Sequence, residues 1–410
     1  MTPLAKTDDE LRRDPWVGAP LFDPAQRDDP HPALAKLREL DPVNETPLGF
    51  WRLTRYDDVV RVLREVPTGV RKADGSLPGR DRIRFEAGPG EFMLQQDPPN
   101  HTRLRKLVSK AFTPRAIERM RPSVQRLVDG LLDTAQDRGG LDVIADLALP
   151  VPSTVICEMM GVPLADRPRF TDWTADATHL LAAEFAPQEV LQRGLEGAGQ
   201  LASYFVALLN ERRGSLSDDL LSELLRAEEA GDRLSPMELL SQSIGLLIAG
   251  FETTIGLIGN GMLALLRHPR ELERLREDPG LVASAVEECL RFDGPILTTL
   301  RVLREDTEFG GKTIPRDAIV WAMIGAANRD PAKFPDPTRF DVGRTPNEHL
   351  AFGGGVHFCL GAHLARMESQ IAIGSLVRRF PKLELALDGP PEYGRSLFRV
   401  LARLPVRVAA

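Results

Sequence analysis

One stretch of sequence, from Ser235 to Arg267, constrains the fold more than any other. Ser235 can cap a helix, Pro236 suits the first helical position and Glu238 completes a capping box, so we expect a helix to begin there. It should end at Arg267, before a His-Pro pair. About 33 residues at 1.5 Å each give a length of roughly 50 Å. The centre is apolar on nearly every face, which predicts a helix that crosses the interior of the molecule.

Composition indicates a large globular protein. The 410 residues are 42% hydrophobic and 27% charged. No repeat and no Ser/Gly-rich linker divides the chain, so we predict one domain over residues 1–410. The net charge of −7 gives no reason to expect a nucleic-acid partner. The most apolar run, Ile244 to Phe251, is far shorter than a membrane span, and the N-terminus lacks the layout of a signal peptide. We therefore expect a cytoplasmic monomer without a membrane anchor.

The pattern of apolar residues favours a mainly α fold with a smaller β-rich portion (α+β). Spacings of three and four residues predict amphipathic helices over 116–137, 189–212 and 218–230. Short β-type runs follow at 301–302 and 318–323, and then a proline-rich meander at 328–344 whose phenylalanines have a reason to be buried. The helical bulk is expected over about 97–292 and 361–379. The β-rich parts are expected near the N-terminus, over about 295–325, and over 383–410, where a strand pair should lie around 397–408.

Three cysteines, Cys157, Cys289 and Cys359, are too few and too far apart for a disulfide framework. Cys359 follows three consecutive glycines and directly precedes a predicted helix. The glycines allow positive φ and close backbone approach, and a helix N-terminus lowers the pKa of a thiol. This environment suits a metal ligand or a nucleophile; the alternative is a structural cysteine in a glycine turn. Zinc is disfavoured because no second cysteine lies within ligand spacing. We expect Cys157 and Cys289 to be small core residues.

Two further patterns could carry chemistry. His101 and Arg105, four residues apart near a helix start, form either an anion clamp or a solvated basic face. Glu252 lies in the middle of the apolar helix, where a carboxylate is expensive to bury, and the hydroxyl of Thr253 should bond the carbonyl of Ala249. The alternative is a kinked structural helix with a satisfied glutamate.

The cysteine loop resembles the haem-binding loop of the cytochrome P-450 family. It reads Phe352-Gly353-x-Gly355-x-His357-x-Cys359-x-Gly361, followed by Leu364-Ala365-Arg366. The resemblance implies a P-450-type fold with haem beneath the long helix and Cys359 as the thiolate ligand of the iron. Phe352 and Gly361 belong to the same cofactor-binding loop. The haem propionates would be held by His101, Arg105, Arg301 and His357.

The resemblance also assigns residues outside the loop. Glu252 and Thr253 occupy the acid and alcohol positions of the family's oxygen-activation motif. The Glu-x-x-Arg pair of Glu288 and Arg291 is structural in the family and is joined by an arginine from the meander, for which Arg339 is the matching position.

The implied activity is an O2-dependent monooxygenase that contains haem b and inserts one oxygen atom into its substrate. Electrons would come from another protein, because the chain has no nucleotide-binding Gly-x-Gly-x-x-Gly after a strand. The resemblance to soluble bacterial members of the family implies a ferredoxin with its reductase, which draws on NAD(P)H. The family's pocket positions are nearly all apolar here, which suits a lipophilic substrate such as a fatty acid, terpenoid or polyketide. These positions are Phe92, Met93, Leu94, Ile248, Ala249, Ile296, Leu297, Leu397 and Phe398.

Two surface features have two interpretations each. Arg103, Lys106 and Lys110, with Arg105, form either a docking face for the redox partner or a solvated helix surface. The segment 170–187, which includes Leu180, Leu181 and Phe185, is either a lid or ordinary core.

Three rival functions remain open. A haem sensor or carrier could use the same thiolate, although it needs no acid-alcohol pair. A peroxygenase of the family would have Arg and Pro in place of Glu252 and Thr253, and this replacement is absent. The last rival is a haem-free helical protein with a structural cysteine.

Overall fold

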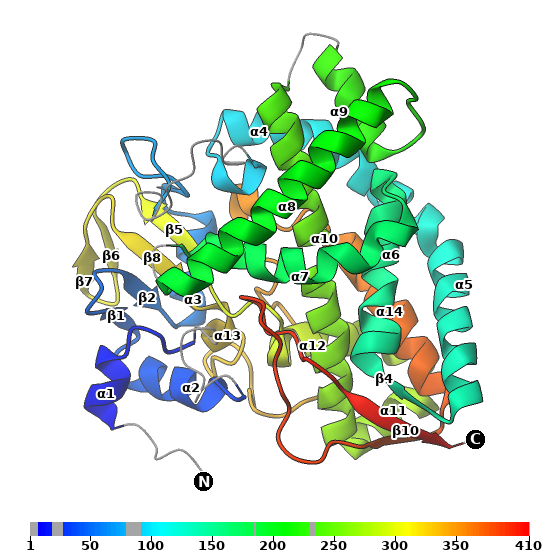
Figure 1. The fold of residues 1–410 in the computed structure, drawn as a ribbon. Helices are drawn as coiled ribbons and strands as arrows, with labels where there is room; N and C mark the ends of the chain where they lie inside the picture. The colour runs from blue at the N-terminus through cyan, green and yellow to red at the C-terminus, as the bar shows by residue number, and fades with distance from the viewer. Residues whose placement is uncertain (1–6, 19–27, 79–91, 184–185, 230–233, 410) are drawn as a thin grey trace.

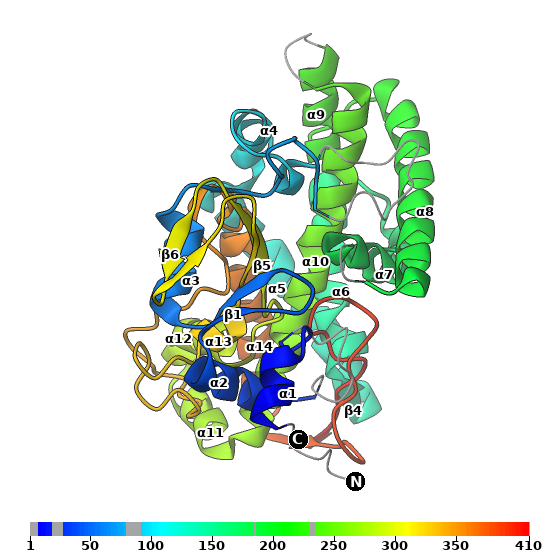
Figure 2. The same ribbon diagram turned by 90° about the vertical axis from the view of Figure 1, so that its left-hand side faces the viewer.

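Helix α10 (Pro236–Arg267) runs through the middle of the molecule, as its apolar sequence predicted (Figure 1, Figure 2). The computed structural model describes residues 7–18, 28–78, 92–183, 186–229 and 234–409. The capping box is present: Ser235 N donates to Glu238 Oε2 at 2.8 Å, and Glu238 N donates to Ser235 Oγ at 3.1 Å. Among the described residues only α10 is long and apolar enough to span a membrane, but 78% of its most apolar window is buried within the protein, as in a core helix.

Helices make up 58% of the structure and strands 10%, which confirms the mainly α prediction with a smaller β-rich portion. Helices α6, α7, α8, α12 and α14 all pack against α10. The other described helices are α1 (Asp8–Arg13), α2 (His31–Leu40), α3 (Tyr56–Arg64), α4 (Asn100–Val108), α5 (Pro114–Arg138), α6 (Pro150–Met160), α7 (Arg167–Ala177), α8 (Gln188–Arg213), α9 (Leu220–Glu229), α11 (Pro269–Glu277), α12 (Val282–Asp293), α13 (Ile324–Ala327) and α14 (Ala362–Arg379).

The largest sheet joins the N-terminal part of the chain to the segment that follows α12. Its strand order is β1-β2-β8-β5-β3, and only the β2–β8 pair is parallel. Its strands are β1 (Val43–Glu45), β2 (Trp51–Leu53), β3 (Thr68–Gly69), β5 (Thr299–Leu303) and β8 (Ile319–Ala322). A hairpin of β6 (Thr307–Phe309) and β7 (Lys312–Ile314) lies between β5 and β8 in sequence. Both β-rich regions predicted before residue 330 are therefore confirmed.

The predicted strand pair around 397–408 is only partly correct. Strand β10 (Pro405–Ala409) pairs with β9 (Lys382–Leu385) and β4 (Gly140–Asp142), whereas residues 397–404 form no strand beyond a single bridge from Leu401 to Tyr393. The polar groups of this segment serve other contacts. Arg399 N donates to Pro295 O at 2.9 Å, and its guanidinium binds Asp293. We call residues 393–401 the C-terminal loop.

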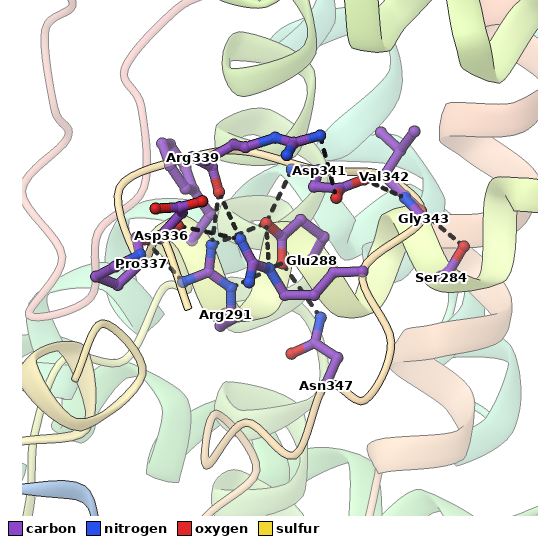
Figure 3. Close-up of polar contacts among 12 residues, drawn as sticks. Ser284, Glu288, Arg291, Asp336, Pro337, Arg339, Asp341, Val342, Gly343 and Asn347 are labelled. Carbon is purple, nitrogen blue, oxygen red and sulfur yellow. Dashed lines mark hydrogen bonds and ion pairs between the residues drawn. The ribbon is translucent and has the colours of Figure 1, made fainter. Parts of the chain in front are cut away.

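The proline-rich meander is ordered around a buried glutamate in the middle of α12 (Figure 3). Phe334 and Phe340 are buried, as expected. Glu288 is fully buried and receives Arg291 Nε at 2.7 Å and Arg291 Nη2 at 2.8 Å. Arg291 also donates to the main-chain carbonyls of Asn328, Pro337 and Arg339 at 3.0, 2.9 and 3.1 Å. One buried ion pair thus fixes the path of the meander.

The assignment of Arg339 to this cluster is wrong for its side chain. Arg344 Nε lies 3.2 Å from the Glu288 carboxylate, and Arg344 donates to the carbonyls of Pro335, Asp336 and Arg339. The side chain of Arg339 is instead exposed and pairs with Asp341 at 3.5 Å, and only its carbonyl joins the cluster. The meander turns back over α12 after Arg339, and this turn brings the later arginine to the glutamate.

We predict that Arg344→Ala lowers the free energy of unfolding by about 3 kcal/mol, because Glu288 then stays buried with one of its cations removed. Arg339→Ala is the matched control and should cost less than about 1 kcal/mol, since its side chain forms only an exposed ion pair. Urea denaturation of the two variants measures both values. Equal losses would mean that Arg344 has no special part in the cluster.

Candidate active site

The loop that carries Cys359 depends on its glycines, as predicted. Gly353 and Gly355 have φ of 68° and 65°, a region that side chains rarely adopt. A Cβ on Gly355 would clash with the carbonyl of Leu63 at the end of α3, so the loop lies directly on that helix. Cys359 N donates to Phe352 O at 3.0 Å, which closes the loop. Arg105 fastens it from α4 by donating to Val356 O at 3.2 Å and Phe358 O at 2.7 Å.

The pKa of the Cys359 thiol differs from the sequence expectation. Burial raises this pKa, and the N–H of Gly361 and the charges of Arg105 and Arg366 only partly oppose the rise. The expected net lowering by the helix N-terminus is therefore wrong for the protein by itself, because the desolvation of the thiolate outweighs the donors. A cation bound to the sulfur would supply the missing stabilisation.

The other two cysteines are core residues, as expected. Cys157 and Cys289 are both buried. Burial raises the pKa of Cys157 to about 11 and raises that of Cys289 still further. Neither thiol is therefore poised for metal binding or nucleophilic attack.

Three of the four residues assigned to the propionates, His101, Arg301 and His357, are brought together. The rings of His101 and His357 lie 4.4 Å apart, and Arg301 acts electrostatically on His357. Burial and the charge of Arg301 lower the pKa of His357 to about 3, and burial lowers the pKa of Arg301 to about 10. Within the described residues, His101 Nδ1 and His357 Nε2 are buried without a hydrogen-bond partner. Unpaired donors and a buried cation fit an anionic ligand, so this chain suits the propionates of a haem.

Arg105 also belongs to this group by position, since its charge affects His101 and His357. Its described hydrogen bonds go to the cysteine loop, however, and its role as a propionate ligand stays a prediction.

The middle of α10 is exposed on one side. Ala249 is exposed and Ile248 and Thr253 are half-buried, whereas the turns before and after them are buried. This face therefore borders an accessible space instead of packed side chains. Thr253 Oγ1 donates to Ala249 O at 3.3 Å, as the sequence predicted. The helix continues without interruption through Gly250, whose missing Cβ allows close contact with Ile156 of α6.

Glu252 points away from that face and is only 3% exposed. Its carboxyl contacts hydroxyl groups from two other elements: Thr174 Oγ1 of α7 at 3.3 Å, and the side chain of Ser396 in the C-terminal loop. Burial raises the pKa of Glu252 to about 7, although the hydrogen bond that Ser396 donates to the carboxylate acts in the opposite direction. Sequence reasoning missed Thr174 and Ser396, since both lie far from Glu252 in sequence and match no motif.

The predicted pocket residues fall into two groups. Phe92 packs on Gly245 and Met93 N donates to Gln242 Oε1 at 3.3 Å, so this segment lies against α10. Ile296, Leu397 and Phe398 are half-buried. Leu297 instead packs beneath α13, where its Cδ2 would lie 2.7 Å from a Cβ on Gly325, and Leu94 is 42% exposed. The structure therefore gives less support to Leu94 and Leu297 as pocket residues.

The residues of the predicted lid segment, 170–187, differ in their burial. Phe170 is buried, Leu180 packs on Gly194 of α8, and Leu181 is exposed, while Phe185 lies outside the described residues. The structure therefore shows a core part at Phe170 and Leu180 without deciding whether the segment acts as a lid.

Lys106 and Lys110 are exposed on the α4 side of the cysteine loop, whereas Arg103 forms an ion pair with Glu238 of α10. Exposed Val356 and Phe358 project from the loop that Arg105 fastens to the same helix. We call Lys106, Lys110, Val356 and Phe358 the basic face.

Comparisons with known proteins agree with this geometry. The family model described as Cytochrome P450 matches residues 59–398. Cytochrome P450 107B1 of Saccharopolyspora erythraea is 42% identical over 405 residues, which cover 95% of this chain and 97% of the relative. Vitamin D(3) 25-hydroxylase of Pseudonocardia autotrophica is 42% identical over 94% of this chain and 95% of its own length. The crystal structure of myxobacterial CYP267B1 with myristic acid superposes with a TM-score of 0.86 at 44% identity, covering 95% and 99% of the two chains.

The raised pKa of Glu252 predicts a specific dependence of stability on pH. The folded protein releases this proton at about pH 7 and the unfolded chain at about 4.5, so the folded form loses stability as the pH rises between these values. Relative to Glu252→Gln, wild type should lose about 3 kcal/mol between about pH 4 and pH 8. Denaturation of both proteins across this range measures the difference. Exposed Glu223 provides the control, and a difference for Glu252 as flat as that for Glu223→Gln would contradict the burial argument.

Proposed function

Because the chain belongs to the cytochrome P450 family, whose named relatives here include monooxygenases and hydroxylases, we propose that it is an O2-dependent haem-thiolate monooxygenase acting on a lipophilic small molecule. The observation that carries the proposal is the pairing of one thiol with one anion-binding cluster. Cys359 lies in a glycine loop fastened by Arg105, and His101, Arg301 and His357 offer buried donors to an anionic group. Both features fit one ligand, a haem b with its iron on Cys359 and its propionates on the cluster. We propose that residues 1–410 form the single domain that binds the haem and catalyses the reaction.

Haem bound through a thiolate would activate O2 when it is supplied with two electrons and two protons, so the oxidising chemistry would come from the cofactor. The chain's own residues would supply the protons. The hydroxyl of Thr253 lies on the accessible face of α10 and can hydrogen-bond the reacting oxygen. Glu252 holds a proton near neutral pH and can deliver it from the next position along the helix.

The pocket residues favour recognition by shape. Phe92, Ile248, Ala249 and Phe398 are apolar and half-buried or exposed. The relatives are named for a vitamin D(3) hydroxylation and for polyketide biosynthesis, and one solved neighbour holds myristic acid. A fatty acid, terpenoid or polyketide-like substrate agrees with both observations.

The electron donor is proposed to be a ferredoxin supplied by a ferredoxin reductase from NAD(P)H in the cytoplasm. The basic face offers two lysines, neither of which has a partner among the residues that the structure describes, and two exposed apolar side chains on the cysteine loop itself. A small acidic redox protein would dock there close to Cys359. We propose that the protein acts as a monomer.

Replacing Thr253 by Ala should uncouple the reaction. We expect NAD(P)H consumption to continue while product per NAD(P)H falls at least several-fold and hydrogen peroxide rises, because proton delivery loses its hydroxyl. Product, NAD(P)H and peroxide are measured together in the reconstituted system. Thr134→Ala is the control, since its hydroxyl makes the same type of bond to a carbonyl, Gly130 O at 3.1 Å, at an exposed position of α5. Full coupling in the Thr253 variant would remove Thr253 from the mechanism.

Reversing the charge of the basic face tests the docking proposal. We predict that the double variant Lys106→Glu, Lys110→Glu raises the KM for a ferredoxin about tenfold at low salt, and that added salt reduces the difference. Lys382→Glu, an exposed lysine on β9, should leave that KM unchanged. An unchanged KM in the double variant would assign docking to another surface.

A further inference from the structure

Within the described part of the chain, the carboxyl of Glu252 has hydroxyl neighbours and no cation. Thr174 Oγ1 lies 3.3 Å from Glu252 Oε1, and Ser396 bonds the same carboxyl. Ser396 Oγ lies 3.4 Å from Thr178 Oγ1, so a second threonine closes the group. Each of the three hydroxyl side chains is at most 4% exposed. Glu252, Thr174, Thr178 and Ser396 are called the hydroxyl cluster below.

The hydrogens in this cluster can be counted, because each hydroxyl has one hydrogen and two lone pairs. Thr174 Oγ1 lies 2.7 Å from Phe170 O, a carbonyl that can only accept, so the hydrogen of Thr174 goes there. The same argument gives the hydrogen of Thr178 to Ala175 O at 2.6 Å. The oxygen of Thr174 then faces Glu252 as an acceptor, which is the correct partner for a carboxylic acid O–H and the wrong one for a carboxylate.

Ser396 has the one hydrogen that is still free. Its oxygen accepts from Phe398 N at 3.2 Å, while Thr178 Oγ1 accepts from Leu397 N at 3.1 Å. Ser396 can therefore donate to Glu252, and a carbonyl oxygen of a neutral carboxylic acid can accept that bond. The four groups are satisfied together when Glu252 carries its proton on the oxygen next to Thr174.

The charged groups that the structure describes on the surrounding elements have other partners and do not form an ion pair with Glu252. They include Asp172 and Asp176 on α7, Arg193 on α8, and Arg395 and Arg399 in the C-terminal loop, and the titratable His179 directly follows Thr178. Arg395 pairs with Asp172 at 2.9 Å and Asp176 at 3.8 Å, Arg193 lies 3.9 Å from Asp176, and Arg399 binds Asp293 at 3.0 Å. None of these charges contributes to the behaviour of Glu252, whose environment consists of burial and the two hydroxyls.

The cluster joins three separate elements. Thr174 and Thr178 lie at the end of α7 and directly after it, Glu252 lies on α10, and Ser396 lies in the C-terminal loop. The loop is held by Arg399, whose Nε and Nη2 each donate to Asp293 at 3.0 Å, and by Leu397 N on Thr178. The packing of α7 and this loop on α10 therefore determines what Glu252 contacts.

We propose that Thr174 and Ser396 are positioning residues for Glu252: Thr174 accepts the O–H of the neutral acid and favours that form, whereas Ser396 donates to the other oxygen and orients the carboxyl in both protonation states. This inference rests on the proposed function, in which Glu252 supplies protons. It adds which neighbouring groups contact the Glu252 carboxyl while it carries its proton. Movement of α7 away from α10 would remove the acceptor and admit water to the carboxyl.

Infrared difference spectroscopy on the resting haem-loaded protein tests this without turnover. The spectrum of wild type minus Glu252→Gln isolates the carboxylic-acid C=O band of Glu252 from that of Glu368, another buried acid. We expect a band that disappears as the pH rises, with a midpoint near the pKa of about 7. A band absent at about pH 5.5 and above would overturn the proposal.

The two hydroxyl variants should shift the midpoint in opposite directions. Thr174→Val removes a bond made only by the neutral acid and should lower the midpoint by about half a unit to one unit. Ser396→Ala removes the one donor to the carboxylate and should raise it by a similar amount. Thr174→Ser should keep the wild-type midpoint, and Ser203→Ala, at an exposed position of α8, should leave it unchanged.

A midpoint that rises or stays constant in Thr174→Val would overturn the proposed orientation, since Thr174 would then be a donor or a packing residue. A midpoint unchanged in Ser396→Ala would overturn the part assigned to Ser396. The infrared result stands even if the protein forms no product, so a failure of the proposed monooxygenase activity is seen separately, in the turnover assay.

Discussion

The requirement to surround an apolar helix on all sides organises this protein. Helix α10 buries nearly all of its length, and α6, α7, α8, α12 and α14 pack around it. Burial of this much apolar surface is the main favourable term in folding. Two neighbouring polar groups on α10 are accommodated differently: Glu252 bonds hydroxyl groups inside the protein, whereas Thr253 faces accessible space. The chemistry expected of the site depends on this division between neighbouring residues.

Buried charge is handled in three different ways around that helix. Glu288 is paired with Arg291 and Arg344, and this pairing fixes the meander. Glu252 has hydroxyl neighbours and, among the described residues, no cation, so burial favours its neutral form. Within the described residues, His101 and His357 each have a buried ring nitrogen without a hydrogen-bond partner, and they lie beside the buried cation Arg301, which fits an anionic ligand. The first arrangement stabilises the fold, the second stores a proton, and the third suits a cofactor's propionates.

Sequence alone predicted the features that depend on local pattern. The bounds of α10, its capping box, the bond from Thr253 to Ala249 and the positive φ of Gly353 and Gly355 all follow from neighbouring residues. The errors concern contacts between distant segments. Arg344 takes the place expected for Arg339 because the meander folds back after it, and residues 397–404 form other contacts, such as that of Arg399 with Asp293 of α12, instead of a strand. The raised pKa of Cys359 reflects burial, which its local motif does not reveal.

The central claim is that Cys359 is the thiolate ligand of a haem in this chain. The most direct test is the difference spectrum of the purified, dithionite-reduced protein with and without carbon monoxide. The account predicts a strongly red-shifted Soret band in wild type, which marks a thiolate opposite the carbon monoxide, and its loss in Cys359→Ala. An unshifted haem–carbon monoxide band in wild type, or no haem absorbance in folded protein supplied with haem, would contradict the claim.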